Sequence, residues 1–212
     1  MSETIKINPK QPEDDLISRA VRILRKDGVI GYPTETVYGI GSNIFSAAAV
    51  DRIYNLKSRD RSKALIVIAA DIIQVGDLVE EIPEAAERLM ENFWPGPLTM
   101  VFRASRELAG SPFHRSHTIA IRIPDCPICL ALLKSSGFPI ISTSANRSNE
   151  PPAVTAEQVN EKFGDELDLI IDGSETLSTA PSTVVDVTRL PVRVLREGAI
   201  SRLEIDTVLE SD

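Results

Sequence analysis

Basic side chains gather in one short stretch of a chain that is acidic overall. Within residues 51–63, Asp51 and Asp60 stand among five cations, which are Arg52, Lys57, Arg59, Arg61 and Lys63. Guanidinium forks and a lysine ammonium suit the phosphates of a nucleoside triphosphate, so the cluster is a candidate anion site. The alternative is a solvated run of charges that binds no ligand.

Two polar segments follow short apolar runs. Residues 32–39 place two threonines and a carboxylate just past the apolar run 29–32, where a simple turn is the alternative interpretation. Residues 142–148 carry four hydroxyls and an amide, which suit ribose or phosphate oxygens, whereas a helix cap would use one of them. Gly39 and Gly41 complete no dinucleotide fingerprint, and the chain has no GxxxxGK phosphate loop.

Arg122 interrupts the apolar run 118–123. A guanidinium that is buried there needs a partner, because an unpaired buried charge is very unfavourable. The partner is either a structural Asp or Glu or the carboxylate of a substrate, which a guanidinium can bind through two hydrogen bonds. The sequence leaves both interpretations open.

The cysteines and histidines form two close pairs, Cys126 with Cys129 and His114 with His117. If residues 118–124 are extended, they separate the pairs by about 23 Å. That separation is too long for one tetrahedral zinc ion, so we expect no metal site and reduced thiols.

Composition indicates a globular protein of 212 residues, with 42% hydrophobic and 25% charged residues. A net charge of -8 argues against broad binding to nucleic acid. The apolar stretch 64–70 is far shorter than the roughly 20 residues that cross a bilayer, and residues 1–10 lack the apolar core of a signal peptide. We therefore expect a cytoplasmic location, no membrane partner, and one domain over 1–212, with its core at about 15–200 and a short acidic segment at 202–212.

Apolar spacing and turn residues predict alternating helices and strands. Helices are expected over 16–24, 47–56 (after an N-cap at Ser46), 84–92, 126–133 and 156–163, with a short helix or tail from 202. Strands are expected over 29–32, 37–40, 64–69, 98–102, 118–123, 139–141, 167–171, 183–187 and 192–195. This pattern favours a layered α/β fold with an open, mixed sheet and a ligand crevice at strand ends.

Taken together, the motifs resemble the YrdC-like threonylcarbamoyl-AMP synthase family in its single-domain form. The matching segments, in order, are YPTETVYG from Tyr32, Lys57 to Arg59 with the run from Leu65, WPGPLT from Trp94, IRIP from Ile121, STSAN from Ser142, IDG from Ile171, PSTVVD from Pro181 and LREG from Leu195. The resemblance implies a YrdC/RibB-like open, twisted sheet with a concave basic cleft. It also implies that L-threonine, bicarbonate and ATP are joined into threonylcarbamoyl-AMP, with release of pyrophosphate, for the modification of adenosine 37 in tRNA.

The resemblance also assigns residues. It implies that Thr36, Arg122 and Ser182 contact threonine and that Lys57 and Arg59 are catalytic. The expected ATP contacts are Lys57, Arg59, Lys63, Thr118, Ser142, Ser144, Asn146, Pro152 and Arg196. We expect no tightly bound cofactor, with Mg²⁺ arriving on ATP. The resemblance also implies tRNA and tRNA-modification proteins as possible partners.

Three positions depart from the family pattern, because Ile68, Asp60 and Asn149 replace a common histidine, proline and glycine. These departures bear on substrate affinity more than on the class of reaction. The main alternative function is a non-catalytic RNA-binding or maturation accessory. Such a protein does not require Lys57 and Arg59 together with the serine-rich segment. Carbamoyl transfer, as in the larger hydrogenase-maturation proteins that contain a similar domain, is a second enzymatic alternative.

Overall fold

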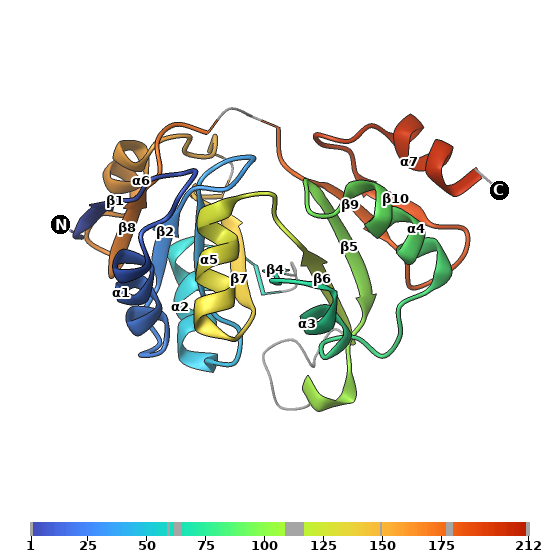
Figure 1. Ribbon diagram of the computed structural model, residues 1–212, viewed down its shortest axis with the longest axis horizontal. Helices are drawn as coiled ribbons and strands as arrows, with labels where there is room; N and C mark the ends of the chain where they lie inside the picture. The colour runs from blue at the N-terminus through green and yellow to red at the C-terminus, as the bar shows by residue number, and fades with distance from the viewer. Residues whose placement is uncertain are drawn as a thin grey trace.

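The computed structural model describes residues 2–58, 60–61, 65–108, 117–148, 150–176 and 180–210. Their strands form one 10-stranded sheet in the order β1-β8-β2-β3-β7-β4-β6-β5-β9-β10 (Figure 1). The strands are β1 (Thr4–Lys6), β2 (Ile30–Tyr32), β3 (Gly39–Asn43), β4 (Ile66–Ile68), β5 (Leu98–Arg103), β6 (Thr118–Arg122), β7 (Ile140–Ser144), β8 (Leu169–Asp172), β9 (Thr183–Asp186) and β10 (Arg193–Arg196).

The sheet is open and mixed, as the sequence predicts. Pairing is parallel between β1 and β8, β2 and β8, β4 and β6, and β5 and β9, and antiparallel at the other junctions. The helices that accompany it are α1 (Asp14–Leu24), α2 (Ala47–Leu56), α3 (Ile72–Gly76), α4 (Glu84–Phe93), α5 (Pro127–Ser136), α6 (Ala156–Phe163) and α7 (Arg202–Glu210), and a 3₁₀ turn lies at Arg106–Leu108.

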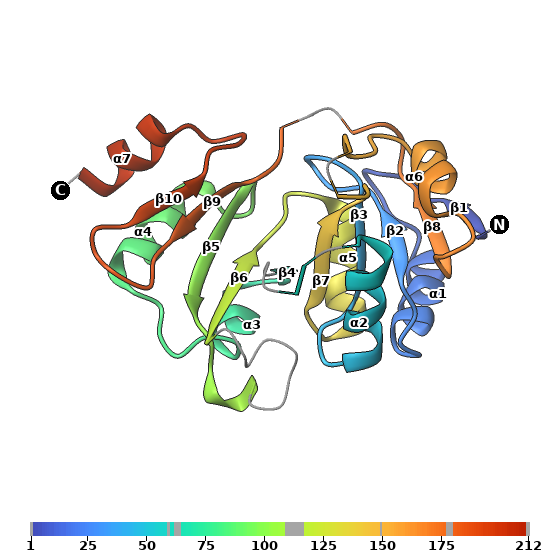
Figure 2. The ribbon, with the colours of Figure 1, turned by 180° about the vertical axis from the view of Figure 1, so that it is seen from behind.

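Helices cover both faces of the sheet. α5 lies in front of β7 in Figure 1, and α2 lies in front in the reverse view of Figure 2. The buried stripe of α1, formed by Ile17, Ala20, Val21 and Leu24 at helical spacing, packs into one apolar cluster with α5. The second cluster contains α2, whose N-cap Ser46 accepts a hydrogen bond from the Ala49 amide as expected.

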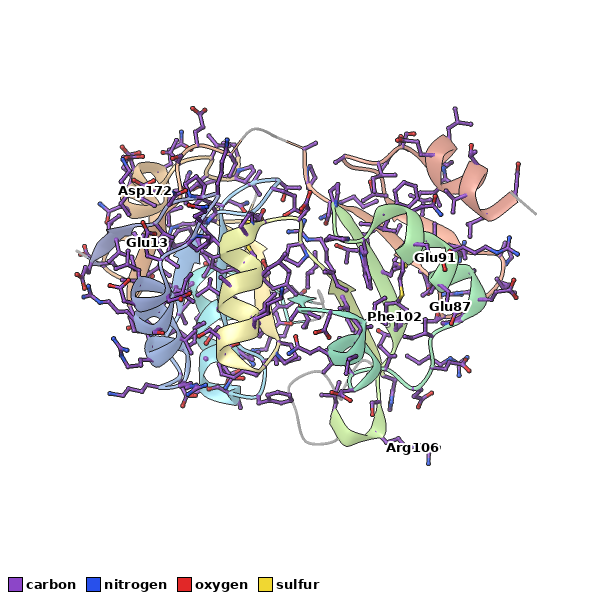
Figure 3. All side chains as sticks on the ribbon, in the orientation of Figure 1. Glu13, Glu87, Glu91, Phe102, Arg106 and Asp172 are labelled. Carbon is purple, nitrogen blue, oxygen red and sulfur yellow. The ribbon has the colours of Figure 1, made fainter. Side chains whose placement is uncertain are left out.

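The half of the sheet made of β5, β6, β9 and β10 is packed by α4 and α7 (Figure 1). Phe102 of β5 is buried there, whereas Glu87 and Glu91 lie on the outer side of α4 (Figure 3). Within the described ranges, no helix combines the length and the apolar character that crossing a bilayer requires.

The structure corrects two predicted boundaries near the polar segments. The strand expected over 37–40 begins at Gly39, because a turn closed by the hydrogen bond from Thr34 to Val37 comes before it. We call residues 34–37 the threonine turn. The strand expected to end at residue 141 continues to Ser144, so the first three residues of the serine-rich segment (residues 142–148) are strand and not loop. Pairing with β3 explains the extension, since Gly39 lies opposite Ser144, while β4 pairs with β7 only as far as Ser142. β1 and α3 are short and were not predicted.

Candidate functional site

A pocket of about 100 Å³ lies where the threonine turn, β6, β7 and the approach to β9 come together. Six of the predicted substrate contacts line it, namely Thr36, Arg122, Ser142, Ser144, Ser182 and Arg196. Among the described residues of its walls, the charged side chains are the two arginines, so the pocket is basic. Segments far apart in the sequence therefore meet at one site.

β6 delivers Arg122 to this pocket by simple alternation. Ile119 and Ile121 point into the apolar core, so Thr118, Ala120 and Arg122 share the opposite face of the strand. The guanidinium is nearly enclosed, with 5% of the residue exposed. A charge held so deeply has to be paired by the protein or by a ligand.

The turn before β3 orients a pair of threonine hydroxyls. Thr34 Oγ1 donates to the Val37 carbonyl at 2.7 Å and accepts from the Thr36 amide at 3.1 Å. Since the single hydroxyl proton of Thr34 is used on Val37, the 2.9 Å contact between the two hydroxyls has Thr36 as its donor. The lone pairs of Thr36 are then left for Arg122, whose Nη1 donates to Thr36 Oγ1 at 3.4 Å.

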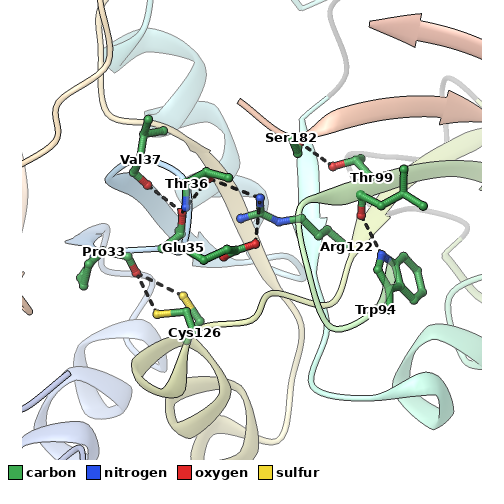
Figure 4. A network of polar contacts seen from close by, with 12 residues as sticks. Pro33, Glu35, Thr36, Val37, Trp94, Thr99, Arg122, Cys126 and Ser182 are labelled. Carbon is green, nitrogen blue, oxygen red and sulfur yellow. Dashed lines mark hydrogen bonds and ion pairs between the residues drawn. The ribbon is translucent and has the colours of Figure 1, made fainter. Parts of the chain in front are cut away.

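Glu35, from the same turn, forms a buried ion pair with Arg122 (Figure 4). The distance from Oε1 to Nη1 is 3.3 Å, and the side chains are 16% and 6% exposed. Within the described residues, both Glu35 oxygens and Arg122 Nε are buried without a hydrogen-bond partner. Leaving a buried polar atom unpaired costs about 1–3 kcal/mol, and a carboxylate ligand would supply the acceptor that Nε lacks.

Of the two interpretations of Arg122, the structural one is confirmed, and capture of a substrate carboxylate stays a prediction. The guanidinium has the structural acid partner that sequence reasoning allowed, yet that pairing leaves Nε available. Sequence reasoning gave Glu35 no role, although its position between the two threonines of the turn was a usable signal. An arginine in an apolar strand and an acid in a nearby polar turn are the residues to pair first.

The opposite wall of the pocket is organised around Ser182. Thr99 of β5 lies 2.9 Å from its hydroxyl oxygen, and Arg196 of β10 donates to the Ser182 carbonyl at 2.7 Å and to its hydroxyl at 3.2 Å. β10 can approach this closely because Gly198 follows it, where a Cβ would lie 2.2 Å from the Pro181 carbonyl oxygen. Thr99 was not predicted as part of the site.

Lys57 supports the serine-rich segment from below. Its ammonium donates to the carbonyls of Ser144 and Asn146 at 2.5 and 2.9 Å and to Asn146 Oδ1 at 3.0 Å. Asn146 Oδ1 also accepts from the Ser144 hydroxyl at 2.6 Å. The residue is 2% exposed and is not part of the pocket wall. Lys57 therefore holds the turn in shape, and its predicted contact with ATP stays a prediction.

The described members of the cationic cluster do not converge on one point. Arg52 pairs with Asp168 and Arg61 with Asp51, each at 2.5 Å, and Arg61 also stacks over Tyr54. The surface pairs resemble the solvated run of charges that was the alternative interpretation. Arg59 and Lys63, which carry much of the predicted phosphate contact, lie outside the described residues.

Two further predicted ATP contacts, Thr118 and Pro152, do not line the pocket. Thr118 lies at the start of β6, on the face that carries Arg122. Pro152 precedes Ala153, whose carbonyl accepts from the Tyr38 amide at 3.0 Å, so this segment lies beside the threonine turn. Of the two histidines, His114 lies outside the described residues, and within the described part no three metal-ligating side chains gather.

The sheet order and this basic pocket define a family. The profile of the Sua5, YciO and YrdC proteins, described as telomere recombination, matches residues 22–198. The chain belongs to the Sua5/YciO/YrdC family.

Individual relatives narrow the comparison. Threonylcarbamoyl-AMP synthase of Bacillus subtilis is 41% identical over 199 residues, which is 92% of this chain and 57% of the relative. The crystal structure of Pyrococcus abyssi Sua5 complexed with L-threonine aligns with a TM-score of 0.92 at 37% identity, over 99% of this chain and 61% of that one. Escherichia coli YciO aligns with a TM-score of 0.86 at 31% identity, over 95% and 98%. The chain thus spans about three fifths of the length of the first two relatives.

Proposed function

We propose that this protein is a threonylcarbamoyl-AMP synthase, which makes threonylcarbamoyl-AMP and pyrophosphate from L-threonine, bicarbonate and ATP. The observation that carries the proposal is Arg122, a nearly buried guanidinium in a basic pocket, whose Nε has no hydrogen-bond partner among the described residues. The relative with bound L-threonine is 37% identical over almost the whole of this chain, which supports an amino acid as the ligand.

In this proposal, Arg122 binds the carboxylate of threonine. Nε supplies a donor that no described protein group uses, and the Thr36 hydroxyl lies within reach of the same guanidinium. Ser182, held by Thr99 and Arg196, offers a fixed hydroxyl on the opposite wall. An amino acid placed between these walls has its carboxylate anchored and its amine directed toward the open part of the pocket.

ATP would bind along the serine-rich segment. Ser142 and Ser144 line the pocket from β7, and Arg196 adds a positive charge on the other side. Lys57 and Asn146 act through the shape of the turn that carries Ser144. Arg59, Lys63, Thr118 and Pro152 remain predicted ATP contacts. Among the described wall residues there is no carboxylate to hold a metal, so Mg²⁺ would come as part of the nucleotide.

The chemistry that this arrangement serves is positioning. The amine of threonine condenses with bicarbonate and loses water, giving a carbamate. One carbamate oxygen attacks the α-phosphorus of ATP, and the bond to the β-phosphate bridging oxygen breaks to release pyrophosphate. Holding the reactants together can supply about 7–11 kcal/mol, and cations near the phosphates stabilise the charge that develops.

The product would serve the threonylcarbamoyl modification of adenosine in tRNA, with the protein acting in the cytoplasm. Contacts with tRNA and with other tRNA-modification proteins belong to this proposal. The net charge of -8 favours a role on small anionic substrates over a role as an RNA-binding platform.

The test is to incubate the protein with ATP, bicarbonate and L-threonine, and to measure pyrophosphate and threonylcarbamoyl-AMP by mass spectrometry. We expect the product only when all three substrates are present, and little or none from Arg122→Ala. Omitting bicarbonate and replacing threonine by serine or valine are the matched controls. A wild-type protein that binds RNA but releases no threonine-dependent pyrophosphate would support the accessory function instead.

A further inference from the structure

Two thiols converge on one backbone carbonyl behind the candidate pocket. Cys126 is the N-cap of α5 and Cys129 lies in its first turn. Their Sγ atoms donate to the Pro33 carbonyl at 3.6 and 3.2 Å (Figure 4). Pro33 directly precedes the threonine turn, which holds Thr34, Glu35 and Thr36, so the thiols anchor the start of this turn.

Packing transmits the position of α5 to this turn. A Cβ added at Gly173 would lie 2.7 Å from Pro33 Cγ and 2.5 Å from Ile128 Cδ1. Gly173, at the end of β8, therefore packs against Pro33 and the first turn of α5 with no room for a side chain. If the two thiols meet the Pro33 carbonyl differently, the turn after Pro33 has to move, because Gly173 leaves no room for Pro33 to shift toward β8.

The two cysteines differ as an attacking and a resolving thiol do. When Cys126 is ionised, the Cys129 thiol turns its hydrogen from the Pro33 carbonyl to the Cys126 sulfur, and this hydrogen bond lowers the pKa of Cys126. Burial raises the pKa of Cys129 well above its usual value. Cys126 is 9% exposed and Cys129 is fully buried. Their spacing of two intervening residues at a helix N-terminus is the arrangement found in thiol–disulfide motifs. A small oxidant would meet Cys126 first.

We propose that Cys126 and Cys129 form a redox modification site, where a peroxide converts the two thiols into a disulfide and thereby loosens the threonine-binding turn. The inference rests on the proposed function for its effect on turnover. The Cys126 thiolate attacks hydrogen peroxide, the O–O bond breaks, and a sulfenic acid and hydroxide form. The Cys129 thiol then attacks that sulfur, the S–O bond breaks and water leaves. Overall, two thiols and one peroxide give one disulfide and two waters.

Oxidation removes both S–H donors from the Pro33 carbonyl. The expected consequence is a weaker hold on Thr34, Glu35 and Thr36, and so on the guanidinium of Arg122 that contacts two of them. We expect the KM for threonine to rise by about fivefold, the effect of losing one ordinary hydrogen bond, with the KM for ATP nearly unchanged.

The experiment treats the whole protein with hydrogen peroxide and follows three measurements. Mass spectrometry should show the loss of two hydrogens and a disulfide between Cys126 and Cys129. Hydrogen exchange in residues 33–38 should become faster, and the KM for threonine should rise. Dithiothreitol should reverse all three, which separates the disulfide from methionine oxidation.

Two double variants isolate the donor role of the thiols. Cys126→Ser/Cys129→Ser keeps two donors but cannot form a disulfide, so it should keep slow exchange and a normal KM in peroxide. Cys126→Ala/Cys129→Ala keeps no donors and should resemble the oxidised protein with or without peroxide. The single variant Cys129→Ser should stop at the sulfenic acid, and it serves if a double variant does not fold.

The inference is wrong if no disulfide forms, or if it forms and leaves both exchange in residues 33–38 and the KM for threonine unchanged. Disulfide formation and exchange are measured without turnover. If the wild type releases no threonine-dependent pyrophosphate while exchange still responds to the disulfide, the proposed function has failed and the redox site has not.

Discussion

Lys57 and Arg122 are equally buried cations, yet the protein uses them in opposite ways. Lys57 is 2% exposed, and its ammonium donates hydrogen bonds to three oxygens of Ser144 and Asn146 at 3.0 Å or less. Arg122 is 5% exposed and meets Glu35 and Thr36 at 3.3 and 3.4 Å, and no described residue accepts a hydrogen bond from its Nε. Burial alone does not mark a ligand-binding cation. The unused hydrogen-bonding groups do.

The largest expected effect comes from Lys57→Met. The change leaves the oxygens of Ser144 and Asn146 without their ammonium donor, so we expect the free energy of unfolding to fall by about 3 kcal/mol. Urea denaturation measures it, and Lys10→Met, at an exposed position, is the matched control, with an expected change within about 0.5 kcal/mol. If Lys57→Met unfolds like the wild type but binds ATP poorly, the charge of Lys57 binds the nucleotide, and the contrast between a structural Lys57 and a ligand-binding Arg122 is wrong.

The next effect sharpens the other side of the comparison. Arg122→Lys keeps a positive charge opposite Glu35 but loses the planar fork that binds a carboxylate through two donors. We expect kcat/KM for threonine to fall by about 10- to 100-fold, while the KM for ATP stays within about twofold. Steady-state kinetics with each substrate varied in turn separates the two. An equal loss for both substrates would place Arg122 outside the threonine subsite.

Much of this fold is visible in the sequence, because the apolar runs are long and well punctuated. The stripe of α1, the Ser46 cap and the alternation that turns Arg122 away from the core could all be derived. The predicted ends of the elements are wrong where pairing with distant strands determines where a strand ends. β7 continues to Ser144 because β3 pairs with it as far as Ser144 and β4 as far as Ser142, which no local pattern reports.

The site was less predictable than the fold. The serines, Thr36, Arg122, Ser182 and Arg196 come together as the motifs indicate. The direction of the Lys57 side chain could not be read from its sequence neighbours, because its partners lie about 90 residues later, on the turn after β7. The Glu35–Arg122 pair is likewise a contact between a turn and a distant strand.

A third prediction tests whether the Glu35–Arg122 ion pair stabilises the folded protein or only neutralises the two buried charges. Glu35→Gln leaves the guanidinium of Arg122 buried without a counter-charge. Because Glu35 is 16% exposed and lies 3.3 Å from Arg122, we expect a loss of about 1.5 kcal/mol in the free energy of unfolding. The double variant Glu35→Gln/Arg122→Met removes both charges and should be more stable than the single variant by about 1 kcal/mol or more. Chemical denaturation of the set completes the cycle. Strict additivity of the two changes would show that the side chains do not interact.

The smallest effect belongs to an exposed ion pair beside the turn that Lys57 holds, and it is set by pH. Lys162 Nζ donates to Glu150 Oε2 at 2.9 Å, and this hydrogen bond lowers the pKa of Glu150. A lowered carboxylate pKa adds stability above the unfolded value near 4.3, and that stability is lost as pH falls through the folded pKa. Lys162→Met should therefore lower the Tm by about one degree at pH 7 and leave it unchanged at pH 3, because an exposed pair contributes little. Thermal denaturation of both proteins across this range measures the difference. A larger loss that persists at pH 3 would mean that Lys162 supports the turn through packing and not through its charge, which would extend the scaffolding role of Lys57 to a second lysine.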